Sequence, residues 1–131
     1  MQISKLKLNK NVSKEMMATF YQTIADLKGK EEVKIFINDF LTKMEKAMLA
    51  KRLMTAVYLE QEKSYDFIKQ NLKISSATIA NVDKMMTKNS QGFTLALRKI
   101  EAEHWAADLA KKITSFINNF ISNKKFKLAR T

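Results

Sequence analysis

Residues 64–86, SYDFIKQNLKISSATIANVDKMM, show the pattern of two short helices with a tight turn between them. Apolar residues at three- and four-residue spacing predict one helix over 65–71 and another over 76–87. Ser64 and Ser75 each precede a helix, where a serine oxygen can accept a hydrogen bond from a free backbone amide. Two short helices joined by a three- or four-residue turn are the layout of a helix-turn-helix.

A small set of apolar residues would fix the angle between these two helices: Ile68, Leu72, Ile74, Ile79 and Val82. The turn contains Lys73 at the position that is usually glycine, so it requires either a strained backbone at Lys73 or another type of turn. Periodicity alone is equally typical of an ordinary helical hairpin, and both interpretations stay open at this point.

The outward face of the second helix is suited to the major groove of DNA. Small side chains allow close approach, alanine can contact a thymine methyl group, and asparagine can pair with adenine through two hydrogen bonds. The residues predicted to face the bases are Ser76, Ala77, Ala80, Asn81 and Lys84. Those predicted to contact phosphates, which set the register without reading sequence, are Ser64, Tyr65, Lys69, Ser75 and Thr78.

The rest of the chain also has helical periodicity, which predicts an all-α fold. Helices are expected over about 13–27, 31–40 and 43–61, with Gly29 suited to the left-handed residue between the first two. Thr42 and Glu45 fit a capping box, in which each side chain accepts a hydrogen bond from the other residue's amide. A last helix of about thirty residues begins near Gly92; its length of about 45 Å predicts that it needs a partner.

The net charge of +11 is concentrated at the two ends of the chain. Residues 1–14 carry four lysines and residues 111–131 carry six basic residues, with no acid in either segment, whereas the middle has 14 bases and 13 acids. Basic arms, at 1–12 and 123–131, are suited to a polyanion, most often nucleic acid. A role in solubility alone is the alternative. We expect the tail, 123–131, to be disordered.

The composition excludes most familiar enzyme classes, so no enzymatic activity is expected. The chain has no cysteine, two glycines that are far apart, and one histidine, His104. These counts leave no thiolate site, no glycine-rich phosphate loop and no histidine-based zinc site or triad, and we expect neither a metal nor a cofactor. The N-terminal residues lack the apolar run of a signal peptide, and a cytoplasmic location is expected.

Residues 40–100 contain, in order and without a large gap, several short matches to one known family. They are Leu41-Thr42 with Glu45, Ala50-Lys51-Arg52-Leu53, Lys63-Ser64-Tyr65, Ile68, Ser76-Ala77-Thr78-Ile79 with Val82, and Gly92-Phe93 with Leu95 and Leu97. With these residues the segment resembles the Trp repressor superfamily, especially its YerC/YecD-like branch. The resemblance implies an all-helical, intertwined homodimer that presents two helix-turn-helix units to operator half-sites about 34–36 Å apart.

The best-known branch of that family binds tryptophan, and its pocket is only partly retained here. Thr42 and Arg52 match the threonine and one arginine of that pocket, whereas its second arginine corresponds to Asn81, its glycine to Val82 and its serine to Met85. Asparagine lacks the planar donors and stacking surface of arginine. We therefore predict a DNA-binding regulator, expected to be a repressor, that does not respond to tryptophan. A repressor gated by another small molecule at Thr42, Arg52 and Met85 is an alternative.

The resemblance ends near residue 100 and leaves a C-terminal helical extension over 101–122. Its apolar stripe, followed by the basic tail, fits an interfacial membrane helix and equally a helix that packs in a dimer. The polar side of the stripe is uncharged, which favours protein packing, and a membrane is not the expected partner. A membrane or protein-interaction module remains the second alternative. The expected organisation is an arm (1–12), a helix-turn-helix domain (13–100), the extension and the tail.

Overall fold

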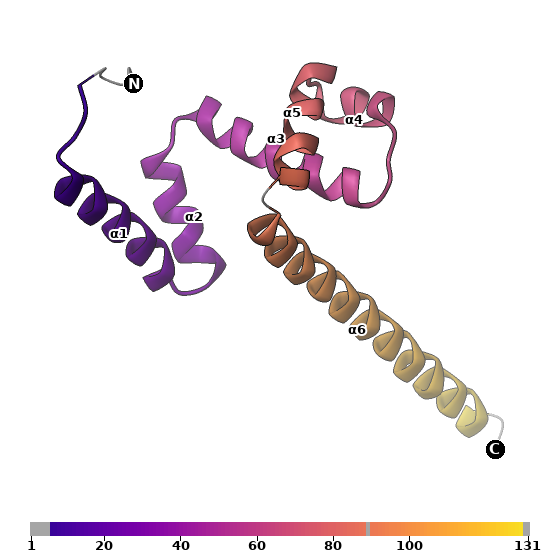
Figure 1. Ribbon diagram of the computed structural model, residues 1–131. Coiled ribbons are helices and arrows are strands. Elements are labelled where there is room, and N and C mark those ends of the chain that lie inside the picture. The colour runs from indigo at the N-terminus through magenta and orange to yellow at the C-terminus, as the bar shows by residue number, and fades with distance from the viewer. Residues whose placement is uncertain (1–5, 89, 130–131) are drawn as a thin grey trace. The chain divides into compact units, whose positions relative to one another are not determined.

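The computed structural model describes residues 6–88 and 90–129, with side chains described as far as residue 125. These residues form an all-α fold, as predicted, and Figure 1 shows the order of its helices along the chain. The helices are α1 (Lys10–Asp26), α2 (Gly29–Phe40), α3 (Lys43–Glu60), α4 (Tyr65–Leu72), α5 (Ser76–Lys88) and α6 (Gln91–Ala129). The chain divides into two compact units, 1–50 and 51–131, with the boundary inside α3.

Local side-chain chemistry fixes the helix starts in the first unit. The Asn9 side chain accepts a hydrogen bond from the Asn11 amide at 2.8 Å, so α1 begins at Lys10, inside the segment expected to be an arm. Gly29 has a φ of +71°, in the left-handed region predicted for it. The capping box at α3 is confirmed, because the Thr42 and Glu45 side chains each accept from the other's amide at 3.1 Å. The first five residues of the predicted N-terminal arm lie outside the described residues.

The capping box also affects a titration. Hydrogen bonding by the Thr42 side chain and backbone lowers the pKa of Glu45. Because the pKa is lowered in the folded chain, the stabilising contribution of Glu45 is present at neutral pH. It is lost as the pH falls through the lowered value.

The helices of the first unit contact each other through aromatic rings but do not form a closed core. The ring of Phe40 lies 4.9 Å from Phe36, in a stacked arrangement, and 6.0 Å from Phe20. Nevertheless, none of the described residues of this unit is buried, and the side chains of Met16 and Val33 are about half exposed. Because its helices are amphipathic and none of its described residues is buried, this unit has apolar helix faces that are exposed to solvent.

The second unit has its core where α3, α4 and α5 meet. The buried apolar residues are Ala56, Val57, Ile68, Ile79 and Val82. Ile68, Ile79 and Val82 were predicted for this core, whereas Leu72 and Ile74 are only partly buried. The sequence did not indicate the contribution of α3. Thr55, beside these residues, is buried with its hydroxyl donating to the Lys51 carbonyl at 2.7 Å, so its polar group is satisfied.

Among the described residues, two other than glycine adopt left-handed conformations, one on each side of α4. Lys73 has a φ of 54°, and its amide donates to the Lys69 carbonyl at 2.9 Å, so the strained alternative predicted for the turn is the one adopted. Glu62 has a φ of 58°. The amides of Glu62 and Lys63 donate to the carbonyls of Leu59 and Tyr58, the bond pattern of a Schellman motif in which Glu62 holds the usual glycine position.

Replacing Lys73 with glycine is expected to raise the free energy of unfolding by about 0.5–1 kcal/mol. The substitution removes the Cβ clash of a left-handed residue, and the entropy of glycine in the unfolded chain offsets part of that gain. Urea denaturation at a fixed protein concentration measures the effect. Lys73→Ala is the matched control, because it removes the charge but keeps Cβ. Equal gains in both variants would contradict the explanation.

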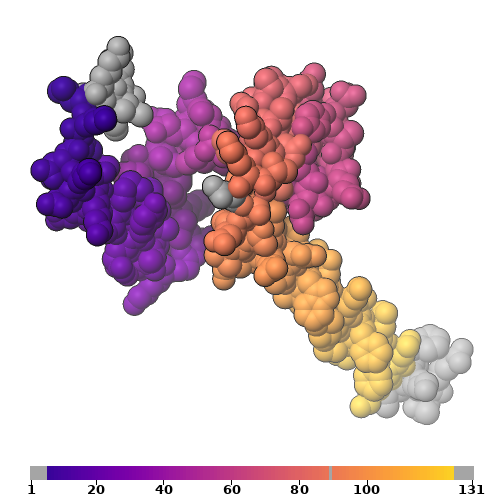
Figure 2. Space-filling view, viewed as in Figure 1, coloured from indigo at the N-terminus to yellow at the C-terminus, as the bar shows by residue number. Residues whose placement is uncertain are grey.

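Figure 1 shows α6 as one continuous helix. It has 39 residues, which corresponds to a length of about 58 Å at 1.5 Å per residue. It continues to Ala129. The expectation of a disordered tail is therefore wrong for residues 123–129. The physical reason is that neither glycine nor proline occurs after Gly92 to end the helix. Every described side chain from 101 to 125 is exposed, and in Figure 2 this part of α6 is seen in orange to yellow. Among the described residues, no helix is both long and apolar enough to cross a bilayer.

Candidate nucleic-acid interface

The α4–α5 pair is a helix-turn-helix whose two helix starts are fixed by serine caps. The Ser64 oxygen accepts from the Phe67 amide at 3.1 Å, and the Ser75 oxygen accepts from the Thr78 amide at 3.2 Å, which confirms both predicted caps. The Ser75 and Thr78 hydroxyls also share a hydrogen bond at 2.9 Å. At Ser64 the hydroxyl proton is not used by the cap, so it can still donate to a ligand oxygen.

Helix α5 has two opposite faces. Ile79 and Val82 are buried against the core, whereas the other face is exposed and contains Ala77, Ala80, Asn81 and Lys84 at positions i, i+3, i+4 and i+7. We refer to these four residues as the readout face. All ten residues predicted to contact DNA are exposed on or beside α4 and α5. The structure therefore places them on one accessible supersecondary element.

Tyr65, for which a phosphate contact stays a prediction, also makes a contact within the protein. Its hydroxyl donates to the Asp83 carboxylate at 3.1 Å and so joins the first turn of α4 to α5. This hydrogen bond, with desolvation as a smaller cause, raises the pKa of Tyr65, so the hydroxyl is protonated and able to donate at neutral pH. Tyr65 is a positioning residue. Asp83 was missed because its partner lies 18 residues away, beyond any local sequence pattern.

An aromatic contact and a cation fix α4 against the end of α3. The Tyr58 and Phe67 rings meet edge to face with centroids 5.2 Å apart, and the Lys63 ammonium lies 5.3 Å from the Phe67 centroid. Attraction between a cation and a ring face adds modestly to such packing. In the sequence, Lys63 is distinguished only by its place in a family match. Its place over the ring depends on the left-handed turn at Glu62, which the sequence did not reveal.

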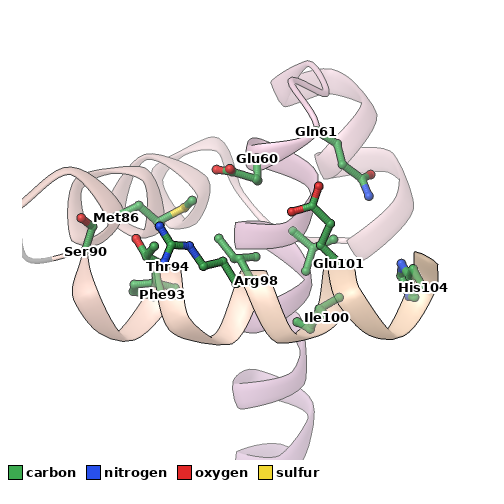
Figure 3. A pocket seen from close by; sticks show the side chains of 12 residues that line it. Glu60, Gln61, Met86, Ser90, Phe93, Thr94, Arg98, Ile100, Glu101 and His104 are labelled. Atoms are coloured by element: carbon green, nitrogen blue, oxygen red, sulfur yellow. The ribbon is translucent and has the colours of Figure 1, made fainter. Parts of the chain in front are cut away.

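The three residues predicted for a ligand pocket are all exposed. The Thr42 side chain caps α3 in the first unit, whereas Arg52 and Met85 belong to the second. A groove of about 630 Å³ lies between α3, α5 and α6 of the second unit. Neither Arg52 nor Met85 lines it. Figure 3 shows Glu60 and Glu101 in this groove together with the side chains of Met86, Phe93 and Arg98.

One comparison with known proteins gives a match. A family model with the description Trp repressor protein matches residues 15–101, about two thirds of the chain. The matched residues include α2–α5, about two thirds of α1 and roughly the first quarter of α6. No curated protein and no solved structure matches the chain. The C-terminal part of α6 lies outside the matched range.

Proposed function

The chain belongs to the Trp repressor family, a family of helix-turn-helix DNA-binding regulators, and from this premise we propose that it is a sequence-specific transcriptional repressor. Its target is a pseudo-palindromic operator in cytoplasmic DNA. The observation that carries this proposal is the readout face of α5, which is exposed directly opposite the buried Ile79 and Val82. Two alanines on that face permit close approach to base edges, and Asn81 supplies the hydrogen-bonding group.

A homodimer is the second part of the proposal. The described residues of the first unit include no buried side chain, although α1 and α2 carry apolar stripes. A second copy covering these stripes would complete a core, since folding requires more buried apolar surface than this unit has alone. Two-fold symmetry would then present two α4–α5 pairs to half-sites about one turn of DNA apart.

The basic ends of the chain are proposed to contact phosphates and make DNA binding steeply dependent on salt. Among the described residues, Lys7, Lys10 and Lys14 near the N-terminus are exposed, as are Lys124 and Lys125 in α6. Each phosphate neutralised by a lysine releases counterions, so affinity falls as the salt concentration rises.

The repressor is proposed not to respond to tryptophan. Asn81 lacks the guanidinium of the family's second pocket arginine, Val82 is buried in the core, and the Thr42 oxygen already accepts a hydrogen bond as a cap. A tryptophan titration of DNA affinity tests this point. A repressor gated by another small molecule is the second candidate, and the groove between α3, α5 and α6 is the observation that favours it.

The experiment that tests the function is selection of DNA fragments by the purified full-length protein at near-physiological salt, followed by sequencing. A two-fold motif with half-sites one turn apart is the expected result. Recovery of DNA without a motif would contradict sequence-specific recognition. Failure to recover DNA would contradict the whole proposal.

Replacing Asn81 with alanine is expected to relax preference at one base pair of each half-site by about 1–3 kcal/mol. The reason is that the alanine side chain cannot form the paired hydrogen bonds with adenine. Affinities for the selected operator and for its single-base variants measure the effect. Lys84→Ala is the matched control on the same face, and is expected to weaken binding to all sequences about equally. Unchanged preference in Asn81→Ala would remove Asn81 from the readout.

A further inference from the structure

The part of α6 beyond the family match carries an apolar seam. Its members are Ala106, Leu109, Ile113, Phe116, Phe120 and Asn123, which follow one another at spacings of 3, 4, 3, 4 and 3 residues. All are exposed; Phe116 is 72 % exposed and Phe120 is 63 % exposed. Alternating spacings of three and four place residues on the contact line of two paired helices. From residue 113 to 123 the helix has no charged residue, so nothing in this segment opposes burial of the seam.

The order of spacings is the same when the seam is followed in the opposite direction. Two copies can therefore pair antiparallel about a two-fold axis located between residues 114 and 115. In that register Leu109 of one copy meets Phe120 of the other, and Ile113 meets Phe116. Ala106 meets Asn123 at each end. Every large apolar member of the seam then lies opposite another large apolar side chain.

The charges at the ends of the seam favour the antiparallel direction. Glu101 and Glu103 lie just before the seam and Asp108 lies within its N-terminal half, whereas Lys124 and Lys125 follow its C-terminal end, all of them exposed. Antiparallel pairing places Glu103 within one residue of Lys125 of the other copy. Parallel pairing would place each cluster beside its own like charges, which is destabilising.

We propose that residues 105–124 of α6 form a self-association surface that pairs antiparallel with the same segment of a second copy. This surface is distinct from the dimer interface proposed for the matched region, and it does not depend on DNA binding. The partner is a second copy because the seam is complementary to itself and the acidic residues that precede it are complementary to the lysines that follow it.

The absence of cysteine from the natural chain allows a direct test with full-length protein. Ala106→Cys and Asn123→Cys are made separately and together, and the proteins are treated with a short bis-maleimide. Antiparallel pairing brings positions 106 and 123 of two copies together but keeps identical positions about 25 Å apart. The double variant and an equimolar, refolded mixture of the single variants are therefore expected to give covalent pairs. Each single variant alone is expected to give none.

The matched control is the pair Lys111→Cys and Asn118→Cys, which has the same register but lies on the polar side of the helix. No crosslinking is expected there. Crosslinking of each seam variant with itself would show parallel pairing and overturn the proposal. Failure of the double variant to crosslink would also overturn it, and if the protein then floated with phosphatidylglycerol vesicles, the seam would be a membrane surface.

A second set of variants tests the charge argument in the Ala106→Cys/Asn123→Cys background. Reversing Glu101 and Glu103 to lysine, or Lys124 and Lys125 to glutamate, is expected to slow crosslinking roughly tenfold, and combining both reversals is expected to restore it. Operator binding measured on the same proteins distinguishes failure of this surface from failure of the DNA-binding function. Equal crosslinking in all the variants would overturn the role of charge in setting the direction.

Discussion

Replacing Ile79 with alanine is expected to lower the free energy of unfolding by about 2–5 kcal/mol. Ile79 is fully buried in α5, in the core formed with Val57 of α3 and Ile68 of α4. Truncation removes buried methyl groups and leaves a cavity, and few neighbouring residues are available to fill it. Operator binding should fail along with stability, because the same contact fixes the orientation of the readout face.

Urea denaturation at a fixed protein concentration, followed by circular dichroism, measures the change. Met85→Ala is the matched control, since Met85 lies on the same helix and is 43 % exposed. Its expected effect is small because an exposed side chain loses little burial when it is truncated. Equal destabilisation by the two substitutions would show that the α4–α5 core does not depend on Ile79.

Replacing Ala80 with glutamate is expected to lower affinity for the selected operator by about 100-fold or more, equivalent to about 2.7 kcal/mol. Ala80 is exposed in the middle of the readout face. A carboxylate there would be held close to phosphate and base oxygens, and the longer side chain would prevent close approach of α5. The free energy of unfolding should change by no more than about 0.5 kcal/mol, because the site is on the surface.

Fluorescence anisotropy with labelled operator, together with a denaturation curve, separates these two effects. Ala107→Glu is the matched control, because it makes the same chemical change at an exposed position of α6 outside the family match. It alters the net charge equally but should change affinity little. Comparable losses in both variants would mean that total charge, and not the readout face, determines binding.

The features predicted correctly from sequence are those set by residues close together in the chain. Thr42 with Glu45, Ser64 with Phe67, and Ser75 with Thr78 each lie three residues apart, and all three caps form as expected. A cap needs only a side-chain oxygen and a nearby free amide, so a few residues contain all the necessary information.

The features that sequence could not predict depend on distant residues or on the absence of a signal. The Tyr65–Asp83 hydrogen bond joins two helices, and the burial of Ala56 depends on where α3 meets α4 and α5. Nothing in the local pattern distinguishes Glu62 as a left-handed residue, since glutamate is an ordinary helix former. The end expected for α6, near residue 122, was wrong because a run of basic residues does not by itself terminate a helix.

In the candidate site, too, the features set by the local sequence pattern were predicted, whereas those set by the packing of distant helices were not. Exposure of the readout face follows from helical periodicity, so Ala77, Ala80 and Asn81 were placed correctly on the surface of α5. The groove between α3, α5 and α6 requires the packing of three helices. Its lining residues Met86 and Phe93 therefore could not be derived from the residues matched to the family's ligand pocket.

The left-handed residues Glu62 and Lys73 have a consequence for how this chain can evolve. Glycine at both positions would raise stability by an amount similar to the loss from one modest core truncation, and effects at separate sites add approximately. In a selected population these two substitutions would act as global suppressors. They would allow destabilising changes in α5 to persist long enough for a new operator preference to arise.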